Sequence, residues 1–210
     1  MKKSKMKEIP GKFLSNNEER LRPRLGNDNF LRFESSSHSH YAQLMEEAPV
    51  FKSAFNRRMF EYAIPCLAMY RALLGELNMK KEDAFVILED IVEWSTRSEI
   101  EDNWVNRLTL RILLSSSLFA KMYTKTITGL KEKHGWLAEA VPGPALISFD
   151  MTRCAILEYL KTQKTVELCP VFCFADRIAA KYMKGIRFER TRTLAEGAEV
   201  CDFRYYLNDI

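Results

Sequence analysis

The chain has 210 residues, a mass of 24.5 kDa and a formal net charge of +4, with 47% hydrophobic and 29% charged residues. This composition is typical of a soluble globular protein of ordinary domain size. The longest uncharged apolar runs fall short of the roughly 20 residues that cross a bilayer, and no apolar stretch follows the basic residues 1–13. We therefore expect neither a membrane span nor a secretory signal.

The positive charge is confined to the start of the chain. Residues 1–35 contain nine Lys and Arg against five Asp and Glu, whereas residues 36–210 contain 23 of each sign. A nucleic-acid-binding domain usually carries a basic face on its folded part, so we expect no nucleic-acid partner. Residues 1–40 mix charges with Asn, Ser, Pro and the segment SSSHSH. We interpret them as a basic, partly irregular arm that precedes a single domain over 41–210.

The first half of that domain has helical periodicity. Apolar residues recur at three- and four-residue steps, which predicts helices over 48–78, 81–96 and 103–124, with a short extension to 133. Pro65 should kink the first of these or divide it in two. This first helix has a Phe- and Met-rich face, which we expect to pack in the core. The alternative is that the same face forms a homodimer interface.

The segment VPGPA at 141–145 ends the helical regime, since two prolines flanking a glycine do not fit inside a helix. Period-two patterns then predict strands over 147–152, 186–193 and 200–207. Two short helices, over 154–161 and 169–183, are predicted between the first and second of these strands. The last two strands should form an antiparallel hairpin, because Gly197 in their linker accepts a positive φ. The expected fold class is α+β, with an N-terminal helical layer over 41–140 packed on a C-terminal antiparallel β-sheet with short helices over 145–207.

Five cysteines in a chain without a secretory signal indicate reduced thiols in the cytoplasm. Cys66 lies in the helical half, and the other four fall in the last 57 residues. Their spacing lacks the paired C-x2-C of zinc ribbons, and no histidine follows His134, so we expect no metal. No GxSxG, P-loop, GxGxxG or HExxH segment is present, which removes support for serine hydrolases, nucleotide triphosphatases, dinucleotide enzymes and zinc proteases.

Cys173 and Asp176 admit two interpretations. If a helix begins at Cys173, its thiol is the N-cap, and the amide dipoles favour the thiolate. Alternatively, Asp176 completes the cap, and Cys173 is a small buried hydrophobe. If the helix instead has Pro170 as its first residue, Cys169 becomes the capping thiol.

Cys201 and Asp202 are neighbours on a predicted strand, so their side chains point to opposite faces. Cys201 shares its face with aromatic residues, which indicates packing and an inert thiol. Asp202 shares the other face with Arg204, where Arg190 and Arg192 could meet them across the hairpin. That face is either a ladder of cross-strand ion pairs or a strip that binds an anion.

Three motifs in the C-terminal part carry a resemblance to a known family. They are MTRCA at 151–155, CFAD at 173–176 and RTRTLAEGAEVCDFRY at 190–205. In this order they resemble the L-2-amino-thiazoline-4-carboxylic acid hydrolase-like family, and the resemblance covers about 145–207. It implies a hydrolase of carbon–nitrogen bonds outside peptides, in which water opens a cyclic amidine acid to an N-carbamoyl-cysteine-type product.

The resemblance also implies roles for named residues, without a cofactor. Cys173 and Asp176 are the candidate pair for attack and proton transfer, with Cys154 or Cys201 as a second catalytic thiol. The substrate carboxylate needs a cation, which an arginine supplies in bidentate geometry. The candidate substrate-binding residues are Arg153, Arg192, Asp202 and Arg204.

The end of the last motif, in which Gly197 is followed by Cys201, Asp202 and Phe203, also resembles the small-molecule-binding domains related to 4-vinyl reductases. This resemblance implies an alternative function: a ligand-binding or sensor module without catalysis, in which the cysteines line a pocket. A structural subunit that presents its helical face to a partner is a third alternative. An enclosed apolar pocket without a convergent acid would favour the binding module.

Overall fold

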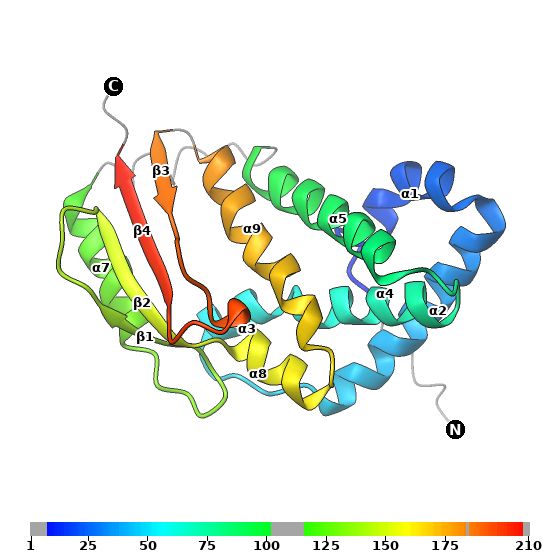
Figure 1. Ribbon diagram of the computed structural model, residues 1–210, viewed down its shortest axis with the longest axis horizontal. Helices are drawn as coiled ribbons and strands as arrows, with labels where there is room; N and C mark the ends of the chain where they lie inside the picture. Colours follow the sequence, from blue (N-terminus) through cyan, green and yellow to red (C-terminus); the bar gives the residue numbers. More distant parts are fainter. Residues whose placement is uncertain (1–7, 102–115, 184, 208–210) are drawn as a thin grey trace. The chain divides into compact units, whose positions relative to one another are not determined.

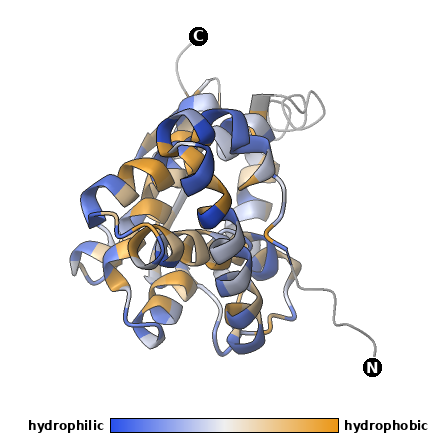
Figure 2. Ribbon diagram, turned by 90° about the vertical axis from the view of Figure 1, so that its right-hand side faces the viewer, coloured by the Kyte–Doolittle hydropathy of each residue, from blue (hydrophilic) through white to orange (hydrophobic). Residues whose placement is uncertain are grey.

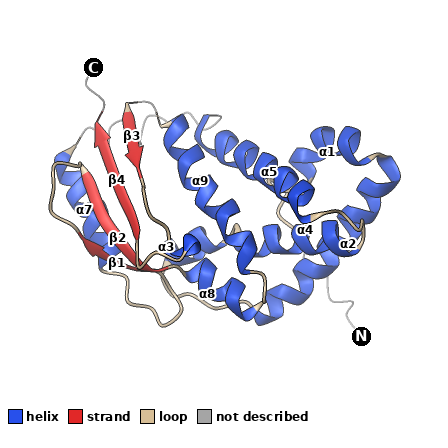
Figure 3. Ribbon diagram, viewed as in Figure 1, coloured by secondary structure: helices blue, strands red, loops and turns tan. Residues whose placement is uncertain are grey.

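The computed structural model describes residues 8–101, 116–183 and 185–207, and its fold is α+β, as predicted. N-terminal helices precede a four-stranded antiparallel sheet (Figure 1; Figure 3). Two compact units are present: Met1–Val50 with Met59–Ser95, and Phe51–Arg58 with Thr96–Ile210. That residues 41–210 form one domain stays a prediction. No helix within the described ranges is long and apolar enough to cross a membrane.

Residues 18–40 of the predicted, partly irregular arm are helical, apart from a break at Gly26. A 3-10 turn, Ser15–Asn17, leads into α1 (Glu18–Leu25) and α2 (Asn27–Glu47). Phe13, Phe30 and Phe33 are fully buried, and α2 packs on α4 (Ala63–Gly75). The serines and histidines of SSSHSH have modest helix propensity, and burial of the apolar face of α2 outweighs it.

Pro65 divides the first predicted helix, as expected. α3 covers Ala54–Phe60, and Pro65 lies in the first turn of α4, where a missing amide hydrogen costs little. Ten of the thirteen residues of α4 are buried, so this helix belongs to the core of the first unit. Figure 2 shows the hydrophobic stretches of the helices beside their hydrophilic ones.

The next two predicted helices are found where the chain is described. α5 runs over Lys81–Glu101, a little beyond its predicted end. α7 runs over Ser117–Thr128, and the Ser116 hydroxyl caps it by accepting a hydrogen bond from the Phe119 amide. The remainder of the helix predicted over 103–124 lies outside the described residues.

The second unit contains the sheet, whose strand order is β1-β2-β4-β3 with every pair antiparallel. The strands are β1 (Leu137–Ala140), β2 (Ile147–Arg153), β3 (Ile186–Glu189) and β4 (Cys201–Leu207). β2 and the β3–β4 pairing confirm the sequence predictions, whereas β1 was not predicted. Between the strands lie two helices, α8 (Ala155–Thr162) and α9 (Cys169–Tyr182).

The sheet has one apolar and one polar face. On the apolar face the rings of Phe149 and Phe203 stack with centroids 4.9 Å apart, and Phe188 contacts Tyr205 at 4.8 Å. Such ring pairs stabilise a sheet by about 0.5–1.5 kcal/mol beyond the area they bury. α7 packs against β1 and β2, and α9 packs against β3 (Figure 1). The polar face carries Asp150 of β2 and Arg204 of β4.

The β3–β4 hairpin is shorter than predicted. β3 ends at Glu189, four residues before the end of the predicted strand, and a 3-10 turn, Leu194–Glu196, follows where the linker was predicted. Gly197 then ends that turn with φ at 87°, which confirms the predicted positive φ. The residues between Glu189 and Leu194 are therefore free of strand pairing and take other partners.

Candidate active site

Three thiols meet where α8 and α9 begin. Cys154 is the N-cap of α8, and its sulfur accepts a hydrogen bond from the Leu157 amide at 3.5 Å. Cys169 is the first residue of α9, and Cys173 lies one turn later. Cys169 is hydrogen-bonded to the thiols of both Cys154 and Cys173. All five cysteines of the chain are free.

Cys169 is the hydrogen-bond donor in this thiol group. Its bonds to Cys154 and Cys173 raise its own pKa and keep it protonated. The same bonds lower the pKa of Cys154 and of Cys173, against the opposing effect of burial. The charge of Arg190 lowers the pKa of Cys173 further. One S–H proton serves one acceptor at a time, so the group stabilises a single thiolate.

The predicted capping roles within α9 are wrong. The helix begins at Cys169 with Leu168 in the N-cap position, and no side chain caps it. Pro170 lies in the first turn, where its missing amide hydrogen has no cost. Cys173 is therefore inside the helix, and the one of these thiols that caps a helix is Cys154.

Asp176 follows Cys173 on α9, and it is paired with Arg190. The Arg190 Nη1 lies 2.5 Å from the Asp176 Oδ2, and Nη2 donates to the Cys173 carbonyl oxygen at 2.7 Å. The Arg190 side chain is 1% exposed and that of Asp176 28%. Burial raises the pKa of Asp176, and the ion pair opposes this effect. Arg190 thus holds the carboxyl next to the thiol group, rather than meeting Asp202 across the hairpin as predicted.

Two tyrosines complete the surroundings of Asp176. Burial, helped by the charge of Asp176, raises the pKa of Tyr123 on α7 to about 12. The same causes raise the pKa of Tyr205 on β4 well above its usual value. Both phenols therefore stay protonated at neutral pH. Tyr123 is not among the predicted site residues, because nothing in its helical segment marks it as near a site.

Cys201 lies beside the thiol group without joining it. Its sulfur accepts a hydrogen bond from the Leu194 amide at 3.1 Å, and the residue is 5% exposed. Burial raises the pKa of Cys201 to about 11. This thiol has the packed environment that the sequence indicates for it, and it is protonated at neutral pH.

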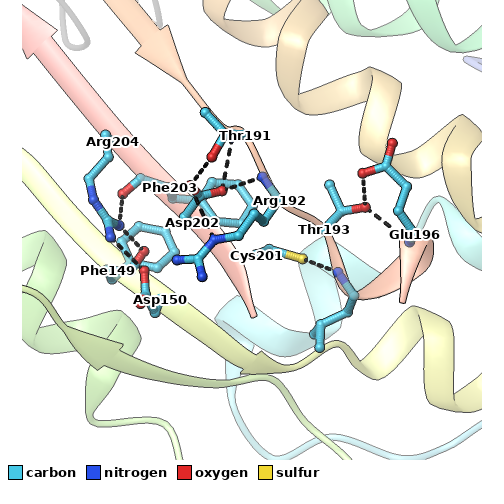
Figure 4. Close-up of polar contacts among 11 residues, drawn as sticks. Phe149, Asp150, Thr191, Arg192, Thr193, Glu196, Cys201, Asp202, Phe203 and Arg204 are labelled. Carbon is cyan, nitrogen blue, oxygen red and sulfur yellow. Dashed lines mark hydrogen bonds and ion pairs between the residues drawn. The ribbon is translucent and has the colours of Figure 1, made fainter. Parts of the chain in front are cut away.

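Two of the predicted substrate-binding arginines contact backbone carbonyls. Arg153 donates through Nε to the Gly135 carbonyl oxygen at 2.8 Å and through Nη2 to that of Glu132. Arg204 donates through Nη1 to the Phe149 carbonyl oxygen at 2.8 Å, and it pairs with Asp150 at 2.7 Å (Figure 4). Both contacts fasten neighbouring segments to the sheet. The Arg204–Asp150 pair joins β4 to β2, whereas the predicted ladder paired Arg204 and Asp202 with Arg190 and Arg192 across the hairpin.

Asp202 binds the segment that follows β3. Its Oδ1 accepts hydrogen bonds from the amides of Thr191 and Arg192 at 2.9 and 2.7 Å, and its Oδ2 accepts one from the Thr191 hydroxyl at 2.6 Å (Figure 4). The Arg192 Nε lies 3.8 Å from Oδ2, and its side chain is 56% exposed. Asp202 therefore fixes the turn that places Arg190 on the apolar side.

Asp202→Asn is expected to lower the free energy of unfolding at neutral pH by about 2 kcal/mol. The side-chain NH2 group of the asparagine, itself a donor, would face the donors of Thr191 or Arg192 in place of a carboxylate oxygen. Burial acts to raise the pKa of Asp202, but hydrogen bonds from Thr191 and Arg192 outweigh it and leave the pKa below its usual value. This stabilisation is present above the unfolded-state pKa of about 4 and is lost as pH falls through the folded-state value. Urea unfolding across acidic pH tests it. An unchanged midpoint and pH slope in the variant would contradict this role.

A cavity of about 310 Å³ opens between α9 and β3. Its lining residues are Arg177, Ala180, Lys181, Ile186, Phe188 and Arg190. Because Arg190 both lines this cavity and pairs with Asp176, the cavity adjoins the thiol and carboxyl groups. A second hollow of about 620 Å³ runs along β1 and includes Arg153 in its lining. In the described part of the chain, no three His, Cys, Asp or Glu side chains are grouped as metal ligands.

Comparison with known proteins gives one match. A family model described as L-2-amino-thiazoline-4-carboxylic acid hydrolase matches residues 56–205. The matched range includes the thiol group, Asp176, Arg190 and the sheet except for the last two residues of β4. No curated protein and no solved structure matches the chain. Since the family model covers well over half of the residues, the chain belongs to the L-2-amino-thiazoline-4-carboxylic acid hydrolase family.

Proposed function

We propose that this protein is a hydrolase that opens a small cyclic amidine acid of the 2-amino-thiazoline type, giving an N-carbamoyl-cysteine-type product. One observation carries the proposal: α9 places Cys173 one turn after Cys169 and within one turn of Asp176, which is paired with the buried Arg190. This combines a stabilised thiolate with a carboxyl group of raised pKa. Family membership supports the hydrolase class.

The first proposed step is attack by the Cys173 thiolate on the ring carbon that carries the amino group. A carbon–sulfur bond to Cys173 forms, the bond from that carbon to the ring sulfur breaks, and the ring sulfur takes a proton from the Asp176 carboxyl. The enzyme then carries an isothiourea on Cys173. This division of one difficult step into two is the usual advantage of covalent catalysis.

In the second step, water adds to the same carbon. Water gives one proton to the Asp176 carboxylate and one to the former ring nitrogen, and the bond to Cys173 breaks to leave a urea carbonyl. The thiolate and the protonated carboxyl are both restored, and one water molecule is consumed. The charge of Asp176 acts to raise the pKa of Cys173, so a proton on Asp176 during the cycle favours the Cys173 thiolate.

The remaining candidates have supporting roles in this proposal. Cys154 is the other acceptor of the Cys169 proton and so the second thiol of the group. Cys201 is protonated and packed, which suits a structural contact. Of the predicted substrate-binding residues, Arg192 has the most exposed guanidinium, whereas Arg153, Arg204 and Asp202 hold the fold. Since the nucleophile must be reduced, we place the protein in the cytoplasm.

The test is to incubate the protein with 2-amino-thiazoline-4-carboxylate and to follow thiol release with a colorimetric reagent, identifying the product by mass. Wild type should release one thiol for each N-carbamoyl-cysteine formed. Asp176→Asn is expected to lower kcat at least about a hundredfold, as loss of an acid–base group does. Asp150→Asn, on the polar face of the sheet, is the matched control and should retain most of the activity.

A different result would remove the proposal. If wild type releases no thiol from this acid, the hydrolase assignment for this substrate fails. If the acid binds without being consumed, the ligand-binding module becomes the better account of the same site. If Asp150→Asn and Asp176→Asn lose activity equally, Asp176 has no special role in the chemistry.

A further inference from the structure

We infer that the cavity between α9 and β3 binds the carboxylate of the substrate, with Arg177 and Arg190 as its principal ligands. This inference rests on the proposed function for the identity of the substrate. It assigns the carboxylate to a different set of cations from the arginines that the sequence motifs indicate. Arg153 and Arg204 contact carbonyl oxygens within the fold. Arg190 does so too, but its buried Nε–H has no acceptor and it lines the cavity.

The lining of the cavity is cationic. Three of its six residues are Arg or Lys, and no acidic residue lines it among those the structure describes. Arg177 and Lys181 are exposed, so a ligand can reach them from solvent. A small anion is the ligand that such a lining attracts.

Arg190 adds an unused hydrogen-bond donor. Its two Nη atoms are engaged by Asp176 and the Cys173 carbonyl, whereas its Nε–H is buried and has no partner. A buried donor without an acceptor is unfavourable. An oxygen of a bound carboxylate would satisfy this donor and pair with the guanidinium charge.

The apolar side of the lining fits a small ring. Phe188, Ile186 and Ala180 form it, and the Phe188 ring lies 5.7 Å from the Arg190 guanidinium. An aromatic side chain next to an arginine offers a ring a flat apolar surface beside a cation. The cavity volume of about 310 Å³ suits a ligand of one ring and one carboxylate rather than a nucleotide or a peptide.

The spacing along α9 relates the cavity to the nucleophile. Cys173 and Arg177 are four residues apart, so they lie on the same side of the helix. Their separation along the helix axis is about 6 Å. This matches the size of a five-membered ring bearing a carboxylate. A carboxylate at Arg177 therefore brings the reactive ring carbon to the level of the Cys173 thiol.

The test measures binding with a ring acid that cannot be turned over. Thiazolidine-4-carboxylate has the ring and the carboxylate but lacks the amidine, and thiazolidine lacks the carboxylate as well. Arg177→Gln is expected to raise the Kd of the acid about tenfold by calorimetry and to leave that of thiazolidine unchanged. Arg187→Gln removes another exposed arginine, on β3 and outside the cavity lining, and should change neither value.

Several results would overturn the inference. These are no binding of the acid to wild type, an unchanged Kd in both Arg177→Gln and Lys181→Gln, and inorganic phosphate binding as tightly as the acid with the same dependence on Arg177. The results that contradict the proposed function differ from those that contradict the carboxylate site. Arg177-dependent binding without thiol release keeps the cavity and removes the hydrolase, whereas thiol release with an unchanged KM in Arg177→Gln removes the cavity alone.

Discussion

Replacing Cys173 by serine is expected to lower kcat/KM for ring opening at least about a thousandfold, because a neutral hydroxyl replaces the thiolate as the attacking group. The replacement leaves the helix and its neighbours in place, since the side chains have similar size. The measurement is thiol release from 2-amino-thiazoline-4-carboxylate under saturating and subsaturating conditions. Product formed by the variant should carry the same mass as that formed by wild type.

Two further cysteines serve as controls for this result. Cys66 lies in α4, in the helical unit, and burial raises its pKa to about 12. Cys66→Ser should therefore leave kcat/KM within about twofold of wild type, provided that the protein is folded. Cys154→Ser should retain more activity than Cys173→Ser. An equal loss in Cys154→Ser would contradict the choice of Cys173 as the nucleophile.

Cys169 acts through its neighbours, so its replacement has a distinct signature. Its hydrogen bond lowers the pKa of Cys173, and Cys169→Ala removes that bond. The acid limb of the pH–rate profile should then move to higher pH, with activity recovering in part as pH rises. A uniform loss of activity at every pH would instead indicate a structural role for Cys169.

Arg190→Met is expected to lower the free energy of unfolding by about 3 kcal/mol, the largest effect on stability predicted for this protein. The substitution leaves Asp176 without its cation and the Cys173 carbonyl without its donor. It also removes the cation from beside the rings of Phe188 and Phe203. Urea denaturation followed by circular dichroism measures the loss.

Arg192→Met is the matched control for Arg190. The two arginines are two residues apart, but the Arg192 side chain is 56% exposed and lies 3.8 Å from Asp202. An exposed pair of this kind contributes at most about 1 kcal/mol. Equal losses in the two variants would contradict the buried role of Arg190. Arg190→Lys should recover part of the stability, because a lysine can pair with Asp176 but cannot also reach the carbonyl in fork geometry.

The sequence predicts the fold class well because local patterns dominate most elements. The alternation in β2 and the helical periodicity of α5 and α9 agree with the structure to within a few residues. The prediction from sequence fails at α2, because its serines and histidines are typical of a loop. Burial of Phe30 and Phe33 stabilises the helix there instead. The prediction also misses β1, whose Leu137–Ala140 segment is too short for a periodic pattern to be distinguished.

The site was only partly predictable, for reasons of three-dimensional placement. Sequence identifies the thiols and Asp176 but offers Cys173 or Cys169 as the cap of one helix, whereas α9 begins at Cys169 behind Leu168 and Cys154 caps α8. Arg190 was expected to meet Asp202 on the polar face, although alternation from Ile186 and Phe188 places it on their apolar face, and β3 itself ends at Glu189. The hydrogen bonds from Thr191 and Arg192 to Asp202 interrupt that strand. They place Arg190 with Asp176 instead.

The central claim is that the Cys173 thiolate forms a covalent intermediate with the ring acid. The most direct measurement is rapid acid quenching of wild type with 2-amino-thiazoline-4-carboxylate, followed by intact mass and peptide mapping. Attack by the thiolate with protonation of the ring sulfur adds the whole substrate, so the protein should gain one substrate mass on the peptide containing Cys173. Turnover without that adduct, together with activity retained in Cys173→Ser, would contradict the account.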